Sequence, residues 1–238
     1  MSRARYRRVM LKMSGQSLQG DAGYGIDQGT VNYVASQVHG VRERGVQIGV
    51  VVGGGNIWRG EQASLSGIDR ATADYMGMLA TVINALALKG ALERLHVETR
   101  VQSAITMAQV AESYIREAAI QHLEKGRVVV FGAGTGNPFF TADTAAALRA
   151  LEVGADVLLM AKNRVDGVYT DDPLRNPNAK RYDRLSYIDA LSQGLGVMDS
   201  TALSLCMDNS LPIIVFDLTN PNNLARLLDG EAVGTLIS

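Results

Sequence analysis

The chain has little cysteine, few aromatic residues and no excess of charge. Its 238 residues include one cysteine, Cys206, which excludes an intrachain disulfide and favours a reducing, cytoplasmic location. Leucine and methionine neighbours indicate that this thiol is buried and inert. The formal net charge is −1, which argues against bulk electrostatic binding to nucleic acid or an anionic membrane. We interpret the basic cluster Arg3, Arg5, Arg7 and Arg8 as a solvated N-terminal arm.

Long hydrophobic runs are also absent. No aliphatic stretch approaches the length of a transmembrane helix, and Lys12 interrupts the run 9–11 too early for a signal-peptide core. The three histidines, His39, His96 and His122, lack the spacing of a metal site or a catalytic triad. We expect them to be surface residues.

Buried strands and helices are expected to alternate along the chain. Apolar runs predict strands over 9–11, 47–52, 99–102, 128–131, 156–160 and 213–216, with an edge strand at 234–237. Helices are expected from Asp27 to Gly45, over 71–95, 109–123 and 144–150, near Ile188 and Thr201, and from Asn220. This alternation predicts an α/β fold, a three-layer sandwich with a mainly parallel central sheet and helices on both faces.

The most informative stretch runs from Phe131 to Asp143. A buried strand leads into glycines at 132, 134 and 136 and then into Asn-Pro-Phe-Phe-Thr-Ala-Asp, before a strong helix former. Glycine lets backbone N–H groups approach a ligand, and a strand, a glycine turn and a helix N-terminus together form a phosphate-binding geometry. A tight turn without a ligand is the alternative, but the specific tail favours a site.

Basic residues stand at the ends of other expected strands. Lys12 and Lys162 each follow a buried strand, and Arg59 follows the triplet 53–55. Taken alone, Lys12 is equally compatible with an exposed strand end, and Asp74 is either a helix-dipole partner or a hydroxyl acceptor. Together with Asp143, the basic residues Lys12, Arg59 and Lys162 predict a site that holds polyphosphate, because phosphoryl transfer requires positioning and positive charge.

Two nucleotide-binding classes do not fit these glycines. The sequence contains no G-x-x-x-x-G-K-[ST] motif, which excludes a P-loop kinase. Neither glycine cluster matches G-x-G-x-x-G, because asparagine occupies position 137 and tryptophan position 58. A nicotinamide-binding interpretation is therefore weak.

Five segments, in this order, resemble the bacterial uridylate kinases (UMP kinases) of the amino acid kinase family. They are Lys12-Met13-Ser14-Gly15, Gly53-Gly54-Gly55-Asn56-Ile57-Trp58-Arg59-Gly60, Asp74-Tyr75-Met76-Gly77-Met78-Leu79-Ala80-Thr81, Gly134-Thr135-Gly136-Asn137-Pro138-Phe139-Phe140-Thr141 and Val165-Asp166-Gly167-Val168-Tyr169. The resemblance covers essentially the whole chain. It implies one domain over 1–238, with an acceptor side over about 1–150 and an ATP side over about 151–238.

The resemblance implies ATP-dependent conversion of UMP to UDP in pyrimidine nucleotide biosynthesis. Magnesium would accompany ATP, with no separate metal site in the protein. The family is typically a homohexamer, activated by GTP and inhibited by UTP. The helix 71–95 is apolar around much of its surface, so we expect it to pack against a second copy of the chain in a dimer.

The resemblance also implies roles for particular residues. Asp143 would orient the catalytic Lys12 and Lys162. The residues expected at ATP are Lys12, Met13, Ser14, Gly15, Gly55, Arg59, Asn163, Tyr169 and Asp172. The residues expected at UMP are Gly54, Asp74, Thr135, Gly136, Asn137, Pro138, Phe139, Phe140, Thr141 and Ala142. The loop linked to GTP activation would be Gly20, Asp21, Ala22, Gly23, Tyr24 and Gly25.

The chain departs from the relatives' pattern at two places. Many relatives carry glutamate where this chain has Gln16, and some lack one residue around Lys162 and Asn163. Arg100 and Arg127 match the effector region only weakly. Two alternatives stay open: a kinase of the same superfamily that phosphorylates a carboxylate, and a non-catalytic nucleotide-binding protein of the same fold.

Overall fold

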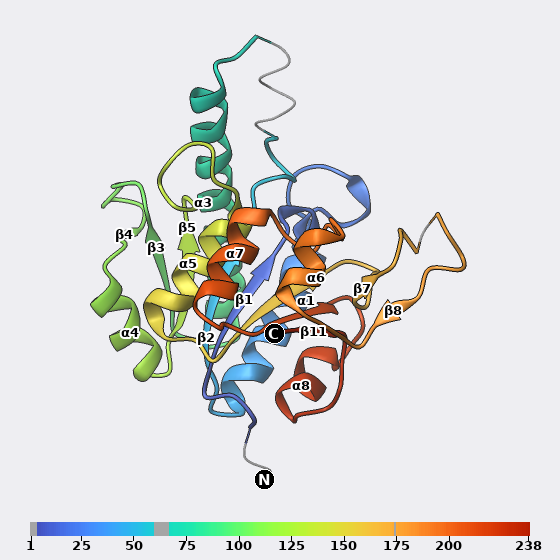
Figure 1. Cartoon of the computed structure of the whole chain (residues 1–238). Helices are drawn as coiled ribbons and strands as arrows, with labels where there is room; N and C mark the ends of the chain where they lie inside the picture. Colours follow the sequence, from blue (N-terminus) through green and yellow to red (C-terminus); the bar gives the residue numbers. More distant parts are fainter. Residues whose placement is uncertain (1–3, 60–66, 174) are drawn as a thin grey trace.

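A mostly parallel sheet forms the centre of the molecule. The structure is a computed structural model and describes residues 4–59, 67–173 and 175–238, so Arg3 and Gly60 lie outside the described residues. Within them, nine strands follow the order β4-β3-β5-β2-β1-β6-β10-β11-β9 (Figure 1). The strands are β1 Arg8–Met13, β2 Gln47–Val52, β3 Thr99–Ser103, β4 Glu112–Ser113, β5 Val128–Gly132, β6 Val157–Lys162, β9 Arg184–Leu185, β10 Ile213–Asp217 and β11 Thr235–Ile237.

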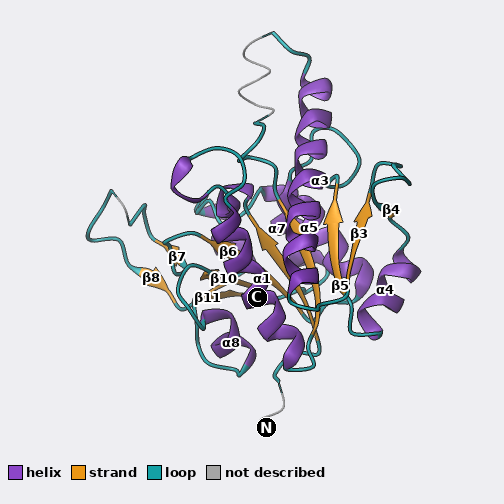
Figure 2. Ribbon diagram, turned by 180° about the vertical axis from the view of Figure 1, so that it is seen from behind, coloured by secondary structure: helices purple, strands orange, loops and turns teal. Residues whose placement is uncertain are grey.

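Helices cover both faces of this sheet, and a small hairpin stands apart from it (Figure 2). The helices are η1 Gly15–Leu18, η2 Gly20–Ala22, α1 Gln28–Glu43, α3 Arg70–Arg94, α4 Arg116–Glu124, α5 Ala142–Val153, α6 Tyr187–Ser192, α7 Ser200–Asp208 and α8 Asn223–Leu228. The hairpin pairs β7 Val168–Tyr169 with β8 Arg181–Tyr182. The expected α/β sandwich with a mainly parallel sheet is confirmed.

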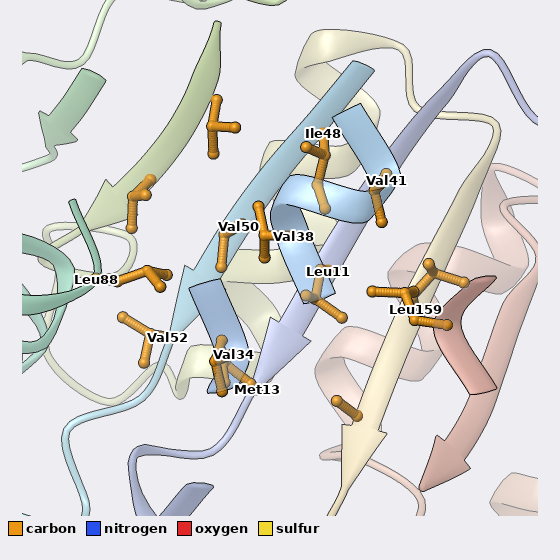
Figure 3. Packing of buried hydrophobic residues seen from close by; sticks show 14 of the residues in the cluster. Leu11, Met13, Val34, Val38, Val41, Ile48, Val50, Val52, Leu88 and Leu159 are labelled. Carbon is orange, nitrogen blue, oxygen red and sulfur yellow. The ribbon is translucent and has the colours of Figure 1, made fainter. Parts of the chain in front are cut away.

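Side chains of the central strands alternate between two cores. Leu11 and Met13 of β1 pack against α1 and α3, beside Leu159 of β6 (Figure 3), whereas Met10 packs in the core of α4, α5 and α7. Successive side chains point to opposite faces of a strand. Each central strand is therefore covered on both sides, which explains its uninterrupted apolar sequence.

Helix boundaries follow local capping groups. The carboxylate of Asp27 accepts a hydrogen bond from the Thr30 N–H and begins α1, as expected. The hydroxyl of Thr141 accepts from the Asp143 N–H and begins α5. Gly154 ends α5 in a left-handed conformation, at φ 66°. The glycine turn therefore enters its helix through a threonine cap next to Asp143.

Three of the expected elements are placed differently. The helix expected over 109–123 begins only at Arg116, because Glu112–Ser113 pairs with β3 as strand β4. The expected edge strand, β11, lies between β10 and β9, since the short β9 adds to its open side. The last helix begins at Asn223 rather than at Asn220.

Two surface assignments were also wrong. The Arg8 side chain is only 11% exposed, because it donates to the Gln47 side chain at 2.7 Å and to the Val153 carbonyl. It is therefore part of the fold rather than of a solvated arm. The His122 side chain is 15% exposed and lies 3.0 Å from a Glu112 oxygen.

Helix α3 is the longest described helix and one of the most apolar. By length and composition alone it could cross a membrane, a test that core helices of soluble proteins also pass. Half of the apolar window is buried in the protein, where Leu88 and Leu92 contact the core. Its other side bears the exposed apolar residues Tyr75, Leu79 and Ile83.

Candidate active site

Four neighbouring parallel strands end at one edge of the sheet. β5, β2, β1 and β6 lie side by side in this order, all parallel. Lys12 lies opposite Val51 of β2 and Met160 of β6, and Lys162 is the last residue of β6. The two lysines and both glycine turns therefore converge at the carboxyl edge, where open α/β sheets bind ligands.

The turn between β5 and α5, residues 133–141, is called the central turn. An ion pair joins Lys12 to α5, the helix that follows this turn. The Lys12 Nζ lies 2.5 Å from Asp143 Oδ1, and the two side chains are 13% and 19% exposed. Asp143 stands in the first turn of α5, where the helix dipole favours a carboxylate. The pair therefore holds a cation at the sheet edge without removing it from solvent.

The second lysine is held by a different segment. Lys162 Nζ donates to the Val197 carbonyl at 2.9 Å. Burial lowers the pKa of Lys162, the charge of Lys12 lowers it further, and Asp143 opposes the shift. Two like charges close together in a partly dry site disfavour protonation of one of them. This arrangement is ready to bind a polyanion that would neutralise both.

Sequence reasoning missed the segment from Val197 to Asp199. The Asp199 N–H donates to Asp143 Oδ2 at 3.3 Å, and its carboxylate accepts from the hydroxyls of Thr141 and Thr144. The same carboxylate caps α7 by accepting from the Ala202 N–H. A capping aspartate could have been expected before this helix, but its contact with α5 depends on the packing of α5 against α7.

A large cavity of about 770 Å³ opens beside the two lysines. Of the residues expected at ATP, five line it: Lys12, Ser14, Asn163, Tyr169 and Asp172. Lys162 and Gln16 also line it, together with the segment 193–197. Met13 and Gly15 lie behind this wall, buried next to β2.

Polar contacts position the outer wall of the large cavity. The Asn163 side chain accepts from the Ser17 hydroxyl at 2.8 Å. The Tyr169 hydroxyl donates to Asp166 at 2.5 Å. Burial would raise the pKa of Asp166, but hydrogen bonds from Tyr169 and Arg181 outweigh it and lower the pKa. Asp172 forms an ion pair with Arg175 at 3.3 Å, so this rim is polar and charged.

A smaller cavity, of about 260 Å³, lies between the central turn and α3. Of the residues expected at UMP, six line it: Gly54, Asp74, Thr135, Phe140, Thr141 and Ala142. The rest of its wall is formed by Trp58, Ala73, Gly77, Met78, Thr81 and Gly134. Gly136, Asn137, Pro138 and Phe139 do not line it, and Phe139 is 69% exposed. The aromatic pair therefore does not pack beneath the turn.

Helix α3 holds the central turn at two points. The Thr81 hydroxyl accepts from the Ala133 N–H at 2.8 Å, and Asp74 Oδ2 accepts from the Phe139 N–H at 2.8 Å. Both Ala133 and Phe139 have positive φ, 60° and 71°, an unusual conformation for residues with a side chain. The two hydrogen bonds fix these backbone amides. Asp74 also faces Arg70 at 3.0 Å.

Several expected residues lie outside both cavities. Arg59 is exposed and donates to the Gly55 carbonyl at 3.2 Å. The loop Gly20, Asp21, Ala22, Gly23, Tyr24 and Gly25 lies apart from the cavity walls, with Tyr24 70% exposed. Arg100 and Arg127 share the carboxylate of Glu98, at 3.2 and 2.8 Å. Cys206 is buried, as expected, and burial raises its pKa to about 12.

Comparison with known proteins decides the family. A model of the amino acid kinase family matches residues 7–217. This chain belongs to the amino acid kinase family. The UMP kinase from Bacillus anthracis is 42% identical, with a TM-score of 0.95 over 98% of this chain and 96% of that chain. The UMP kinase from Ureaplasma parvum is 41% identical, with a TM-score of 0.92 over 98% and 99%.

A third solved structure is less similar in sequence and shares the same fold. The uridylate kinase from Archaeoglobus fulgidus is 32% identical, with a TM-score of 0.74 over 97% of this chain and 99% of that chain. The two places where this chain departs from the pattern of its relatives, Gln16 and the region of Lys162, lie at the large cavity. Gln16 is exposed at its wall, and Lys162 ends β6 opposite Asp217.

Proposed function

We propose that this protein transfers the γ-phosphoryl group of ATP to UMP and so forms UDP for pyrimidine nucleotide biosynthesis. The observation that carries the proposal is the ion pair of Lys12, which lines the large cavity, with Asp143, which directly follows Ala142 of the small cavity. The similarity to UMP kinases at 41–42% identity over nearly the full length supports the choice of substrates. It also favours a nucleotide kinase over a non-catalytic binding protein.

In this proposal the large cavity holds ATP and the small cavity holds UMP. The small cavity is lined by residues 54–142, and the large one mainly by residues 161–215. An acceptor side over about 1–150 and an ATP side over about 151–238 therefore meet at Lys12. In this proposal Gly15, Gly55 and Arg59 contribute from the loops next to the ATP phosphates, and Met13 from the end of β1.

Charge stabilisation is the main chemical task. The transferring phosphoryl group spreads negative charge over its oxygens, so fixed cations lower the barrier most. Lys12 and Lys162 supply these cations, and Asp143 keeps the Lys12 ammonium at the sheet edge. The pKa of Lys162 is lowered in the free protein, and a bound phosphate would favour its charged form.

Magnesium enters this reaction as part of the ATP substrate. Among the described residues, no group of three or more histidine, cysteine, aspartate or glutamate side chains is arranged to hold a metal ion. Asp143 already contacts Lys12 and the Asp199 N–H. Magnesium usually keeps several waters and binds through substrate phosphates rather than in a protein cage, which agrees with this arrangement.

A coupled ADP-release assay with UMP, CMP, aspartate and glutamate tests the function. The hydroxyl oxygens of Thr135 and Thr141 lie at the small cavity and can each accept one further hydrogen bond. A site that hydrogen-bonds one base edge rejects the inverted edge of cytosine. We expect UMP to be used at least ~100-fold more efficiently than CMP. Comparable use of both bases would refute base readout, and activity only with an amino acid would replace the assignment.

We also propose that the enzyme is a cytoplasmic homohexamer activated by GTP and inhibited by UTP. The loop Gly20–Gly25 and the arginines Arg100 and Arg127 are the candidate effector elements. UTP resembles the product and would compete at the small cavity. Initial rates with each effector added at fixed ATP and UMP test this regulation, and unchanged rates with both would contradict it.

A further inference from the structure

Two asparagines are buried beneath the glycine loop 53–55. Asn56 is 1% exposed and Asn84 is 0% exposed. Asn56 Nδ2 donates to Asn84 Oδ1 at 3.0 Å, and Asn84 Nδ2 donates to Asn56 Oδ1 at 2.7 Å. The two amides are thus reciprocally paired, one from the loop and one from the middle of α3.

The remaining amide hydrogens hold two separate loops. Asn84 Nδ2 donates to the Gly53 carbonyl at 2.7 Å. Asn56 Nδ2 donates to the Gly25 carbonyl at 2.7 Å, and the Gly25 N–H donates back to the Asn56 carbonyl at 2.8 Å. All four side-chain hydrogens of the pair are therefore used. The pair joins α3, the loop 53–55 and the end of the loop Gly20–Gly25.

The asparagine pair also sets the distance between Gly15 and the loop 53–55. A Cβ on Gly15 would overlap Asn56 Oδ1 and would lie 2.7 Å from the Gly53 carbonyl. A Cβ on Gly54 would lie 2.7 Å from the Gly77 carbonyl of α3. Gly15 follows Lys12 by three residues, and Gly54 lines the small cavity. The loop 53–55 is therefore wedged between the Lys12 segment and α3.

A buried asparagine pair stabilises the fold less readily than apolar side chains in the same space would. Asparagine has a lower helix propensity than the alanine and leucine around position 84, and each unpaired buried amide would cost about 1–3 kcal/mol. An apolar pair would avoid that risk but would leave the Gly53 and Gly25 carbonyls without these donors. Fully satisfied buried polar networks specify one arrangement.

We propose that Asn84 is a positioning residue for phosphoryl transfer, acting through Asn56 to hold the loop 53–55 in its phosphate-binding conformation. This inference rests on the proposed function and assigns to α3 a role at both substrates. Thr81 fixes the central turn from the same helix, one turn before Asn84. Helix α3 thus fixes the two glycine turns relative to each other.

The test compares Asn84→Ala with Leu88→Ala, a buried apolar site of the hydrophobic core one turn further along α3. Turnover with UMP and ATP is measured well below both melting temperatures. Asn84→Ala should lower kcat by about 10- to 100-fold, because small misplacements near a reacting centre have effects of this size. Leu88→Ala should lose stability but keep the wild-type kcat. Equal kcat for Asn84→Ala and wild type overturns the proposal.

Trp58 provides a readout that does not depend on activity. It is the single tryptophan of the chain, lies three residues after the loop 53–55, and donates from Nε1 to the Ala73 carbonyl of α3 at 3.0 Å. In Asn84→Ala, its fluorescence should become more accessible to acrylamide while far-UV circular dichroism stays native. Unchanged quenching overturns the proposed loop positioning, even if the wild type lacks UMP kinase activity and the proposed function fails.

A double-mutant cycle separates the pair from two independent contacts. Asn56→Ala and Asn84→Ala each break the same reciprocal hydrogen bonds, so the double variant should lose little more kcat than either single variant. Multiplicative losses would show that the residues act separately and would contradict the proposal. If Asn84→Ala does not fold, Asn56→Ala, which lies outside α3, gives the same comparison with Leu88→Ala.

Discussion

At the residue scale, the site depends on how three charged side chains share a small space. Lys12 is paired with Asp143 at 2.5 Å, whereas Lys162 is held by a backbone carbonyl at 2.9 Å. Their different partners give the two lysines different energetics. The charge of Lys12 is compensated by Asp143 in the free protein. Lys162 has only a carbonyl as its partner, and in the proposed reaction the substrate phosphates compensate its charge.

Replacing Lys12 should affect catalysis far more than folding. Lys12→Ala removes a cation from the reacting centre, and we expect turnover to fall by several orders of magnitude. The Asp143 carboxylate remains partly exposed and can be solvated, so the variant should stay folded. Steady-state kinetics and circular dichroism measure both effects. Lys89→Ala, at an exposed ion pair on α3, is the control, and near-normal turnover of folded Lys12→Ala would disprove the role.

Replacing Lys162 should separate activity from stability. Because its pKa in the fold is lowered by burial and Lys12, its charge costs stability in the free protein at neutral pH. Lys162→Met should abolish activity without lowering the free energy of unfolding at pH ~7. This cost in stability disappears as the pH rises toward the ordinary lysine pKa of about 10.4. The free energy of unfolding of the wild type should therefore increase relative to that of the variant. Urea denaturation at both pH values measures this, and the opposite pH trend would contradict it.

At the scale of elements, α3 and the central turn form one unit. The helix supplies Asp74 and Thr81 to the turn and Asn84 to the loop 53–55. The turn in turn enters α5 through the Thr141 cap, which places Asp143. A change in the first two turns of α3 should therefore disturb the small cavity more than the large one.

Asp74 tests this order. Asp74→Asn keeps the shape of the side chain, but its amide group weakens the acceptor for the Phe139 N–H and removes the charge facing Arg70. We expect the KM for UMP to rise at least about 10-fold, the effect of one charge-assisted hydrogen bond, with little change in the KM for ATP. Equal increases for both substrates would remove the assignment, and Asp69→Asn, at the helix cap, is the matched control.

At the scale of the whole molecule, one face of α3 has no partner among the residues that the structure describes. Tyr75, Leu79 and Ile83 stand at helical spacing on this face and are 44%, 49% and 49% exposed. Figures 1 and 2 show the beginning of α3 extending beyond the sheet. Exposed apolar stripes of this kind mark contact surfaces, which supports the expected dimer as the unit of a hexamer.

Charge on this stripe should dissociate the assembly. In analytical ultracentrifugation at micromolar concentration, the wild type should sediment as a dimer or larger, and the double variant Leu79→Lys, Ile83→Lys as a monomer, because two buried lysines cost more than the contact provides. Ile188→Lys, at a site 67% exposed on α6, should leave the assembly unchanged. A monomeric wild type would reject the dimer.

The sequence by itself determined the fold class and most of the segments at the site. Uninterrupted apolar runs such as 128–131, rich in β-branched residues, indicate strands covered on both faces. The motif around Asn137 is distinctive enough to indicate a family. These signals are local: they depend on residues adjacent along the chain. The same locality explains the accurate limits of β2 and of α1, where a cap and a glycine mark the ends.

Tertiary packing alone decided the contacts between distant segments. The limits of α4 depended on the pairing of β4 with β3, and the burial of Arg8 on its contact with Gln47. Asp199 reaches Asp143 and Asn84 reaches Gly53 only because α7 and α3 pack beside the turns. Such hydrogen bonds join residues 31 to 56 positions apart, and single-chain periodicity carries no information about pairs at that separation.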